Sequence, residues 1–164
     1  MKLFFVSLVF MLLSGCSTLP SPKEMQADIE QYKLPKAPAG DKAMVYMVRP
    51  EGLGTFIRFN VFVDNKEDVS EVGYTRGGQY IYFNVTPGKH KILSKAENWD
   101  EMEVESKIGD IIFIKQNVQM GFIMARNSLS RLESVEGTYH VKHLEIGTIK
   151  NENAERAKNT ISQR

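Results

Sequence analysis

Cys16 is the residue of this chain with the most readily interpreted chemistry. It is the only cysteine among 164 residues, and it directly follows Leu13-Ser14-Gly15 at the end of a short apolar stretch. A thiol becomes nucleophilic when it loses its proton, and it can then be alkylated or oxidised. Because no second cysteine is present, Cys16 cannot form a disulfide within the chain. The fold must therefore be stabilised by its core alone.

Three histidines, His90, His140 and His143, are the candidate bases or metal ligands. On a helix, His140 and His143 would share one face, whereas in a strand they would point to opposite faces. No cysteine pair or HExxH pattern completes a metal site, so we expect solvated surface histidines. Ser128 and Ser130 lack the strand, turn and helix context of a hydrolase nucleophile. We therefore expect no enzyme, although a hydrolase-like envelope enzyme remains the alternative.

The segment before Cys16 has the pattern of a secretory signal. Lys2 supplies a positive charge, and residues 3–13 are apolar except for Ser7. This stretch is far shorter than the roughly 20 residues that span a bilayer as a helix. We therefore expect residues 1–15 to be an export signal rather than a membrane span.

The run Leu13-Ser14-Gly15-Cys16 resembles a bacterial lipobox. In the lipoprotein families that it resembles, the cysteine receives a diacylglycerol, the chain is cut before it, and the new amine is usually acylated. Two or three acyl chains make detachment rare, since each buried methylene is worth about 0.8 kcal/mol. We expect a covalent lipid on Cys16, a membrane as partner and no other cofactor. The alternative is an ordinary signal peptide that releases a soluble protein.

Length and charge narrow the function classes further. Removal of residues 1–15 would leave 149 residues, enough for one domain with short extensions. Lys2 is the only charged residue lost, so 20 basic and 20 acidic side chains would remain. This balance gives no sign of nucleic-acid binding. Ser17 stands where the inner-membrane retention signal of many enteric lipoproteins has aspartate, which predicts the periplasmic face of the outer membrane.

Residues 16–41 are predicted to form a tether. Four of the six prolines of the chain fall in it, and such a density favours extended backbone. Ser21-Pro22-Lys23-Glu24 has the pattern of a capping box and predicts a short helix that ends before Pro35. Met25, Ile29 and Tyr32 would form one apolar stripe on it. The stripe could lie on the domain or on the bilayer surface.

From Ala43 onward the hydrophobic period is two, which is typical of half-buried strands. Turn signals such as Gly77-Gly78 separate short strands, without a long helical pattern between them. We expect an all-β fold, a small antiparallel β-sandwich of immunoglobulin-like or transthyretin-like type, over residues 42–147. Residues 129–135 are predicted as its final strand, and residues 148–164 as a polar tail.

Two further segments carry specific expectations. A five-residue loop over residues 96–100 would place Lys91 opposite Glu105, with lysines facing glutamates in an exposed ladder of ion pairs. A cation bound by Glu101, Glu103 and Glu105 is the less favoured alternative. The apolar run over residues 121–125 is too short to span a bilayer, and we expect a buried strand or else a membrane-facing or partner-facing patch.

Tyr80, Tyr82 and Trp99 are the candidate binding residues. In residues 79–85, Ile81, Phe83 and Val85 would face the core, which leaves both tyrosines on the opposite, solvated face. Trp99 would lie at the tip of a loop. Rigid amphipathic rings of this kind can bind a glycan, a peptide or a partner protein.

Several sequence blocks together resemble an uncharacterised bacterial lipoprotein family, the one catalogued as domain of unknown function 2846. The order and spacing of the blocks carry the resemblance, which covers about residues 42–144. Asp64-Asn65-Lys66 stands where the family more often has an aspartate-glycine-lysine turn. The resemblance implies a lipid-anchored, non-catalytic β-sandwich and brings no catalytic residues. The blocks are residues 42–50, 61–64, 86–90 and 120–122, followed by Arg126 and Leu129.

Overall fold

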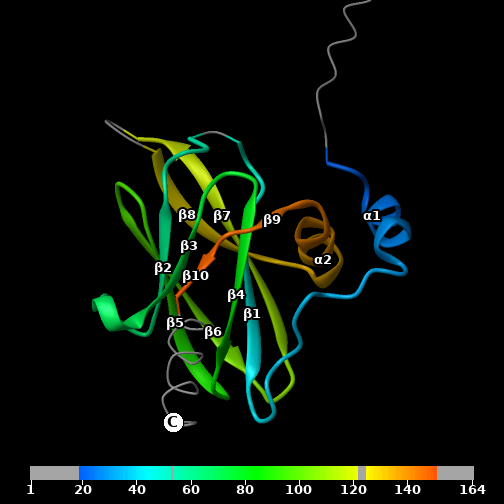
Figure 1. The fold of residues 1–164 in the computed structure, drawn as a ribbon, viewed down its shortest axis with the longest axis horizontal. Coiled ribbons are helices and arrows are strands. Elements are labelled where there is room, and N and C mark those ends of the chain that lie inside the picture. The colour runs from blue at the N-terminus through cyan, green and yellow to red at the C-terminus, as the bar shows by residue number, and fades with distance from the viewer. Residues whose placement is uncertain (1–18, 53, 122–124, 151–164) are drawn as a thin grey trace, which may run out of the picture.

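The computed structural model describes residues 19–52, 54–121 and 125–150, which form two packed β-sheets and a pair of adjacent helices (Figure 1). The elements in chain order are α1 (Pro22–Ile29), β1 (Ala43–Arg49), β2 (Phe59–Val63), η1 (Asp68–Ser70), β3 (Glu71–Thr75), β4 (Gln79–Val85), β5 (Gly88–Lys95), β6 (Trp99–Ser106), β7 (Ile111–Met120), β8 (Ala125–Leu132), α2 (Ser134–His143), β9 (Glu145–Ile146) and β10 (Thr148–Ile149).

Each sheet has five strands. The first sheet has the order β8-β7-β1-β4-β9, and the second has the order β10-β3-β2-β5-β6. The expected all-β sandwich is thereby confirmed. Its first sheet is mixed rather than purely antiparallel, because β1 pairs in parallel with β7 and β4 pairs in parallel with β9. Parallel neighbours need a long crossover connection, and the segments between these strands supply it.

The core lies between the two sheets. Ile81, Phe83 and Val85 of β4 point into it, as the period-two pattern predicts. Strand β1 is buried along its whole length, because the outer face of the first sheet is covered as well. A second apolar cluster lies on that outer face. Its buried members are Met44, Tyr46, Val48, Tyr80, Phe113 and Val141.

A buried polar bridge connects the two sheets through the core. Gln116 of β7 donates from Nε2 to the hydroxyl of Ser94 in β5 at 2.7 Å, and its Oε1 accepts from the hydroxyl of Thr75 in β3. All three side chains are fully buried. Leaving a buried polar group unpaired costs about 1–3 kcal/mol, so this bridge favours a single alignment of the sheets.

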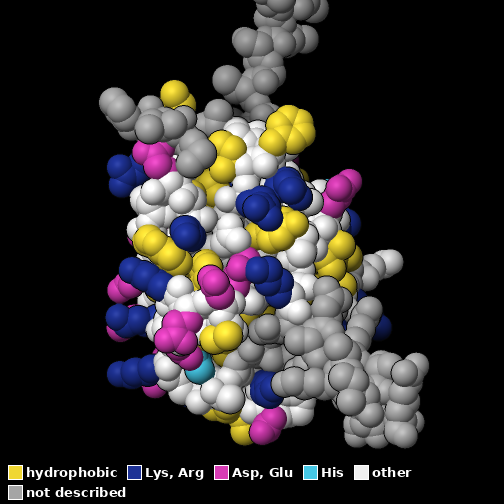
Figure 2. All heavy atoms as spheres, turned by 60° about the vertical axis from the view of Figure 1, so that its left-hand side comes forward, with side chains coloured by type: hydrophobic (Ala, Val, Ile, Leu, Met, Phe, Trp, Pro, Cys, Tyr) yellow, Lys and Arg dark blue, Asp and Glu magenta, His cyan; other side chains and the backbone are white. Residues whose placement is uncertain are grey.

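The β5–β6 hairpin has a shorter loop than expected. The loop spans residues 96–98, so Lys91 lies opposite Glu103 rather than Glu105. A shift of the strand register by two residues keeps every side chain on its predicted face, and lysines of β5 still lie opposite glutamates of β6. Lys91 Nζ lies 3.4 Å from Glu101 Oε1, and Figure 2 shows cationic and anionic side chains interleaved on this side of the molecule. Exposed pairs of this kind contribute about 1 kcal/mol or less each.

Two boundaries at the end of the domain differ from expectation. The strand predicted for residues 129–135 is β8, which ends at Leu132, and helix α2 begins at Ser134. Strand β10 lies inside the segment expected to be a polar tail, and its Thr148 and Ile149 pair with β3. Gly73 of β3 makes this pairing possible, because a Cβ there would lie 2.2 Å from the Thr148 carbonyl oxygen. The sandwich therefore continues to Ile149.

Candidate functional site

The face that carries Tyr80 and Tyr82 is covered. Tyr80 is 7% exposed, and its ring centroid lies 6.3 Å from that of Tyr46. Val141 of α2 packs in the same cluster, and Tyr32 packs against it. Burial raises the pKa of both Tyr46 and Tyr80. The expectation of a solvated tyrosine platform is therefore wrong for Tyr80, and Tyr82 is a partly buried part of the packing.

Trp99 is the first residue of β6 rather than a loop tip. Its ring packs on Phe62, with 5.1 Å between the ring centroids. The ammonium groups of Lys66 and Lys95 lie 5.1 and 5.3 Å from the Trp99 centroid. Cations at this distance are attracted by the electron-rich face of the indole. Trp99 is therefore half-buried among side chains of its own domain.

Helix α1 is docked on helix α2. The predicted capping box is present, because the Ser21 hydroxyl accepts from Glu24 N and the Glu24 carboxylate accepts from Ser21 N. Met25 is 5% exposed, and α1 contacts α2. The apolar stripe of this helix therefore faces the domain. The sequence left open whether the stripe lies on the domain or on the bilayer surface, and in the structure it lies on the domain.

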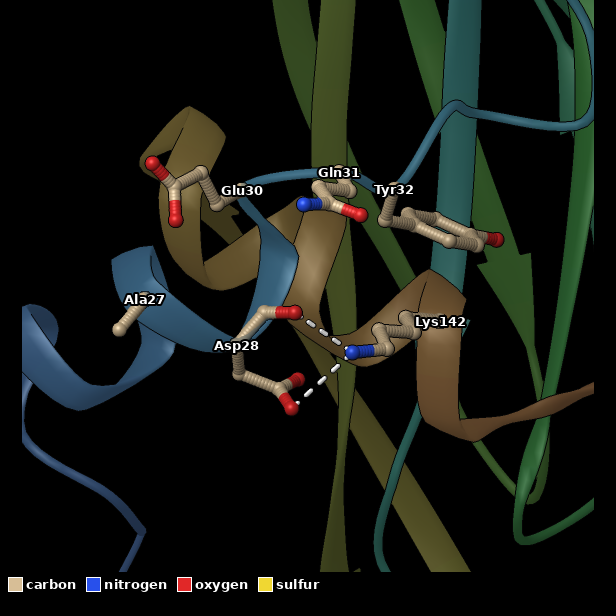
Figure 3. Close-up of a pocket in the computed structure, with 6 residues that line it drawn as sticks. All are labelled: Ala27, Asp28, Glu30, Gln31, Tyr32 and Lys142. Atoms are coloured by element: carbon tan, nitrogen blue, oxygen red, sulfur yellow. Dashed lines mark hydrogen bonds and ion pairs between the residues drawn. The ribbon is translucent and has the colours of Figure 1, made fainter.

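Asp28 clamps the two helices together at an open cavity of about 420 Å³ (Figure 3). Its carboxylate lies 3.0 Å from Lys142 Nζ and 2.7 Å from His143 Nε2, and its carbonyl accepts from Lys142 at 2.6 Å. Hydrogen bonds from His143 and then from Lys142 lower the pKa of Asp28. These contacts hold α1 in place on α2, since three polar side chains from two helices meet there.

The chain after α1 is also fixed to the sandwich. Lys36 N donates to the Tyr46 hydroxyl at 3.0 Å, and that hydroxyl donates to the Lys36 carbonyl at 2.6 Å. Ala39 N donates to Asn84 Oδ1 at 3.1 Å. Residues 19–41 are therefore packed on the domain, which corrects the expectation of a tether over this part. Cys16 and the signal segment lie outside the described residues.

His90 is held between Asp64 and Thr86. Its Nδ1 lies 2.9 Å from Asp64 Oδ2, and its Nε2 lies 2.8 Å from the Thr86 carbonyl and 3.2 Å from the Thr86 hydroxyl. A general base needs an unprotonated nitrogen that faces the hydroxyl. Because the carbonyl is the nearer group, Nε2 is placed to donate to it. This histidine links two turns and is not arranged as the base of a hydroxyl nucleophile.

His140 lies on the buried face of α2 and is 3% exposed. Its Nε2 is 3.6 Å from Glu136 Oε1, and it has no hydrogen-bond partner among the described residues. Burial lowers the pKa of His140, and the nearby charge of Lys115 acts in the same direction, while Glu136 opposes both. The neutral ring is therefore favoured. The expectation of solvated histidines is wrong for His140 and for His90, whereas His143 is half exposed.

The His140 ring borders a cavity of about 320 Å³, together with Leu19, Glu51 and Lys115. Glu51 Oε1 lies 2.6 Å from Lys115 Nζ, and its buried Oε2 lacks a hydrogen-bond partner within the described part of the chain. A neutral imidazole nitrogen and a carboxylate oxygen can both accept hydrogen bonds. Both of these atoms are fully buried, so the two acceptors lie behind the cavity surface rather than on it. The described residues of the cavity lining bring no hydroxyl or thiol nucleophile to the histidine.

The remaining candidates do not assemble into a catalytic or metal centre. Ser128 Oγ accepts from the amide of Gln119 at 3.2 Å, and Ser130 Oγ accepts from the amide of Asn117 at 2.9 Å. Within residues 19–52, 54–121 and 125–150, no group of three or more histidine, cysteine or acidic side chains could hold a metal ion.

The same described residues contain no helix that is long and apolar enough to cross a membrane. The apolar run over residues 121–125 lies largely outside the described residues.

Sequence reasoning did not find the Asp28 clamp or the His140 cavity. Both draw on α2 and on segments far away in the chain, and α2 was not expected. The signal that could have found His140 is the spacing of Glu136 and His140, which places them one turn apart on a helix. Comparison with known proteins adds no relative, since no family model, curated protein or solved structure matches this chain.

Proposed function

We propose that this chain is a lipoprotein of the bacterial cell envelope, anchored by acyl chains on Cys16, that binds or scaffolds another envelope component without catalysis. The component is an envelope protein or a glycan. The resemblance to domain of unknown function 2846 belongs to the same proposal and rests on the sequence blocks alone. The proposed location of the protein is the periplasmic face of the outer membrane, because Ser17 follows the lipidated residue.

One observation supports this function best, namely the short distance in sequence between Cys16 and the packed domain. Leu19 already lines the cavity formed with Pro50 and Glu51, and the docked helix α1 starts at Pro22. Three residues span at most about 10 Å. Acyl chains on Cys16 would therefore hold the sandwich directly at the bilayer surface, which suits a module that presents one face to a membrane-bound partner.

The non-catalytic part of the proposal is supported by the histidine geometry. His90 is placed to donate to a backbone carbonyl, and the described residues that line the His140 cavity include no hydroxyl or thiol nucleophile. The hydrolase alternative would need a histidine aligned with such a nucleophile.

Metabolic labelling tests the proposal. Cells that express the protein are fed radioactive palmitate, and the immunoprecipitated chain is compared with its Cys16→Ala variant. We expect label in the unchanged chain and none in the variant. Equal label in both, or none in either, would overturn the proposal.

Fractionation of the same cells tests the location. The unchanged chain should be found in outer-membrane fractions, and a Ser17→Asp variant is the matched control. It should keep the label and move to the inner membrane in an enteric host. An unchanged chain found in the inner membrane would contradict the assigned place.

A further inference from the structure

Three large apolar side chains are exposed at the end of the sandwich where the described chain begins. Phe56 is 90% exposed, Met120 is 85% exposed and Leu19 is 53% exposed. In Figure 1 the start of the coloured chain, the loop between β1 and β2, and the adjacent ends of β7 and β8 all lie at the upper end of the molecule. Exposed apolar side chains that gather at one end of a domain indicate that this end contacts another surface.

Contacts within the domain place these three segments together. Leu19 lines one cavity with Pro50 and Glu51, at the start of the β1–β2 loop. Farther along this loop, a Cβ on Gly54 would lie 3.4 Å from Ala125, the residue that pairs with Met120. The segments that carry the three exposed side chains therefore lie next to one another at one end of the sandwich. We name it the apolar end and define it by Leu19, Phe56 and Met120.

Three arginines lie near the apolar end. Arg58 and Arg126 are exposed directly beside it. Arg76 lies with Arg58 over the Tyr74 ring, with both guanidinium carbons about 5 Å from its centroid. Glu97, which donates its backbone N–H to the Ala125 carbonyl, is an acidic residue near this surface, and the Glu51 carboxylate is paired with a lysine. Excess arginine favours contact with anionic lipid headgroups.

We propose that the apolar end rests on the lipid bilayer that holds Cys16, with Phe56 and Met120 in the headgroup region and the arginines against anionic headgroups. This inference rests on the proposed function, because it needs the acyl anchor. The anchor fixes which end is near the membrane, since Cys16 is three residues from Leu19 and therefore within about 10 Å of it. The docking of α1 then limits rotation of the domain about the anchor.

The opposite end of the domain provides the matched control. Ile108 is also an exposed apolar residue, at 64% exposure, and lies in the turn before β7. Met120 ends the same strand, which starts at Ile111. At roughly 3.3 Å per residue, the strand separates the two ends by about 30 Å. If the apolar end touches the bilayer, Ile108 stands well outside it.

Tryptophan fluorescence in vesicles with brominated acyl chains tests this orientation. Phe56→Trp and Ile108→Trp are each made in a Trp99→Phe background, and the lipoproteins are purified from membranes and reconstituted in vesicles that contain phosphatidylglycerol. We expect severalfold stronger quenching at position 56 than at position 108, because interfacial groups enter about 5–10 Å into the headgroup and acyl boundary. Circular dichroism of each variant checks that the sandwich is intact.

The outcomes separate this inference from the proposed function. Label on Cys16 together with equal quenching at both positions would overturn the bilayer contact and leave the anchor in place. Stronger quenching at position 108 would mean that the opposite end faces the membrane. Strong quenching at position 56 in vesicles that contain only this protein supports lipid, rather than a partner protein, as the occupant. Absence of label on Cys16 would overturn both.

Discussion

Replacement of Met25 by alanine should release helix α1 from the domain. Met25 is 5% exposed between α1 and the rest of the chain. Met→Ala changes in cores cost about 2–5 kcal/mol, and a site under a peripheral helix can relax, so we expect about 2 kcal/mol. That free energy corresponds to roughly a 30-fold higher population of the undocked state.

Native-state hydrogen exchange measures this population. The backbone amide of Lys36 is a suitable probe, because it donates to the Tyr46 hydroxyl only while the segment is docked. Its exchange rate should rise roughly 30-fold in Met25→Ala, whereas amides in the central strand β1 should change much less. Gln26→Ala is the matched control, since Gln26 is exposed on the same helix. An exchange rate no higher in Met25→Ala than in Gln26→Ala would refute the docking of α1.

Three further predictions concern the sandwich and α2. Gln116→Ala should lower the free energy of unfolding, measured by urea denaturation, by about 3 kcal/mol, because it leaves the buried Ser94 hydroxyl without its partner and creates a cavity; an unchanged urea midpoint would contradict the bridge. Gly137→Ala would bring a Cβ to 2.1 Å from Phe113, so thermal denaturation should show a free energy of unfolding lower by about 1–3 kcal/mol, although alanine is a better helix former than glycine. A higher free energy of unfolding would show that α2 is free to move. Burial lowers the pKa of His140, so the unfolded state binds more protons below about pH 6.5; stability should fall as pH drops from 7 to 5, and His140→Gln should flatten that slope.

The strands were largely predictable, because their pattern depends on neighbours in sequence. Ile81, Phe83 and Val85 alternate with polar or amphipathic residues, and the core takes that face. The cover over Tyr80 was not predictable from its own strand. It comes from residues 32–34 and from α2, which precede and follow β4 by many positions. A strand pattern shows which residues share a face and leaves open what lies on that face.

Helix α2 escaped prediction for local reasons. Its N-cap residue, Glu133, makes no capping hydrogen bond with its side chain. The buried face consists of Gly137, His140 and Val141, so only one large aliphatic residue marks it. Gly137 is required by the close approach to Phe113 and is a poor helix former. The candidate clamp and cavity depend on this helix, and they escaped prediction with it.

Mass spectrometry of the amino-terminal peptide tests the central claim most directly. Trypsin should release residues 16–23 from the mature chain, because Lys23 is the first cleavage site after Cys16. We predict that this peptide begins at Cys16 and carries a diacylglycerol on sulfur, with a further acyl group on its amine. A mature chain that begins at another residue, or a Cys16 peptide with a free thiol, would contradict the account.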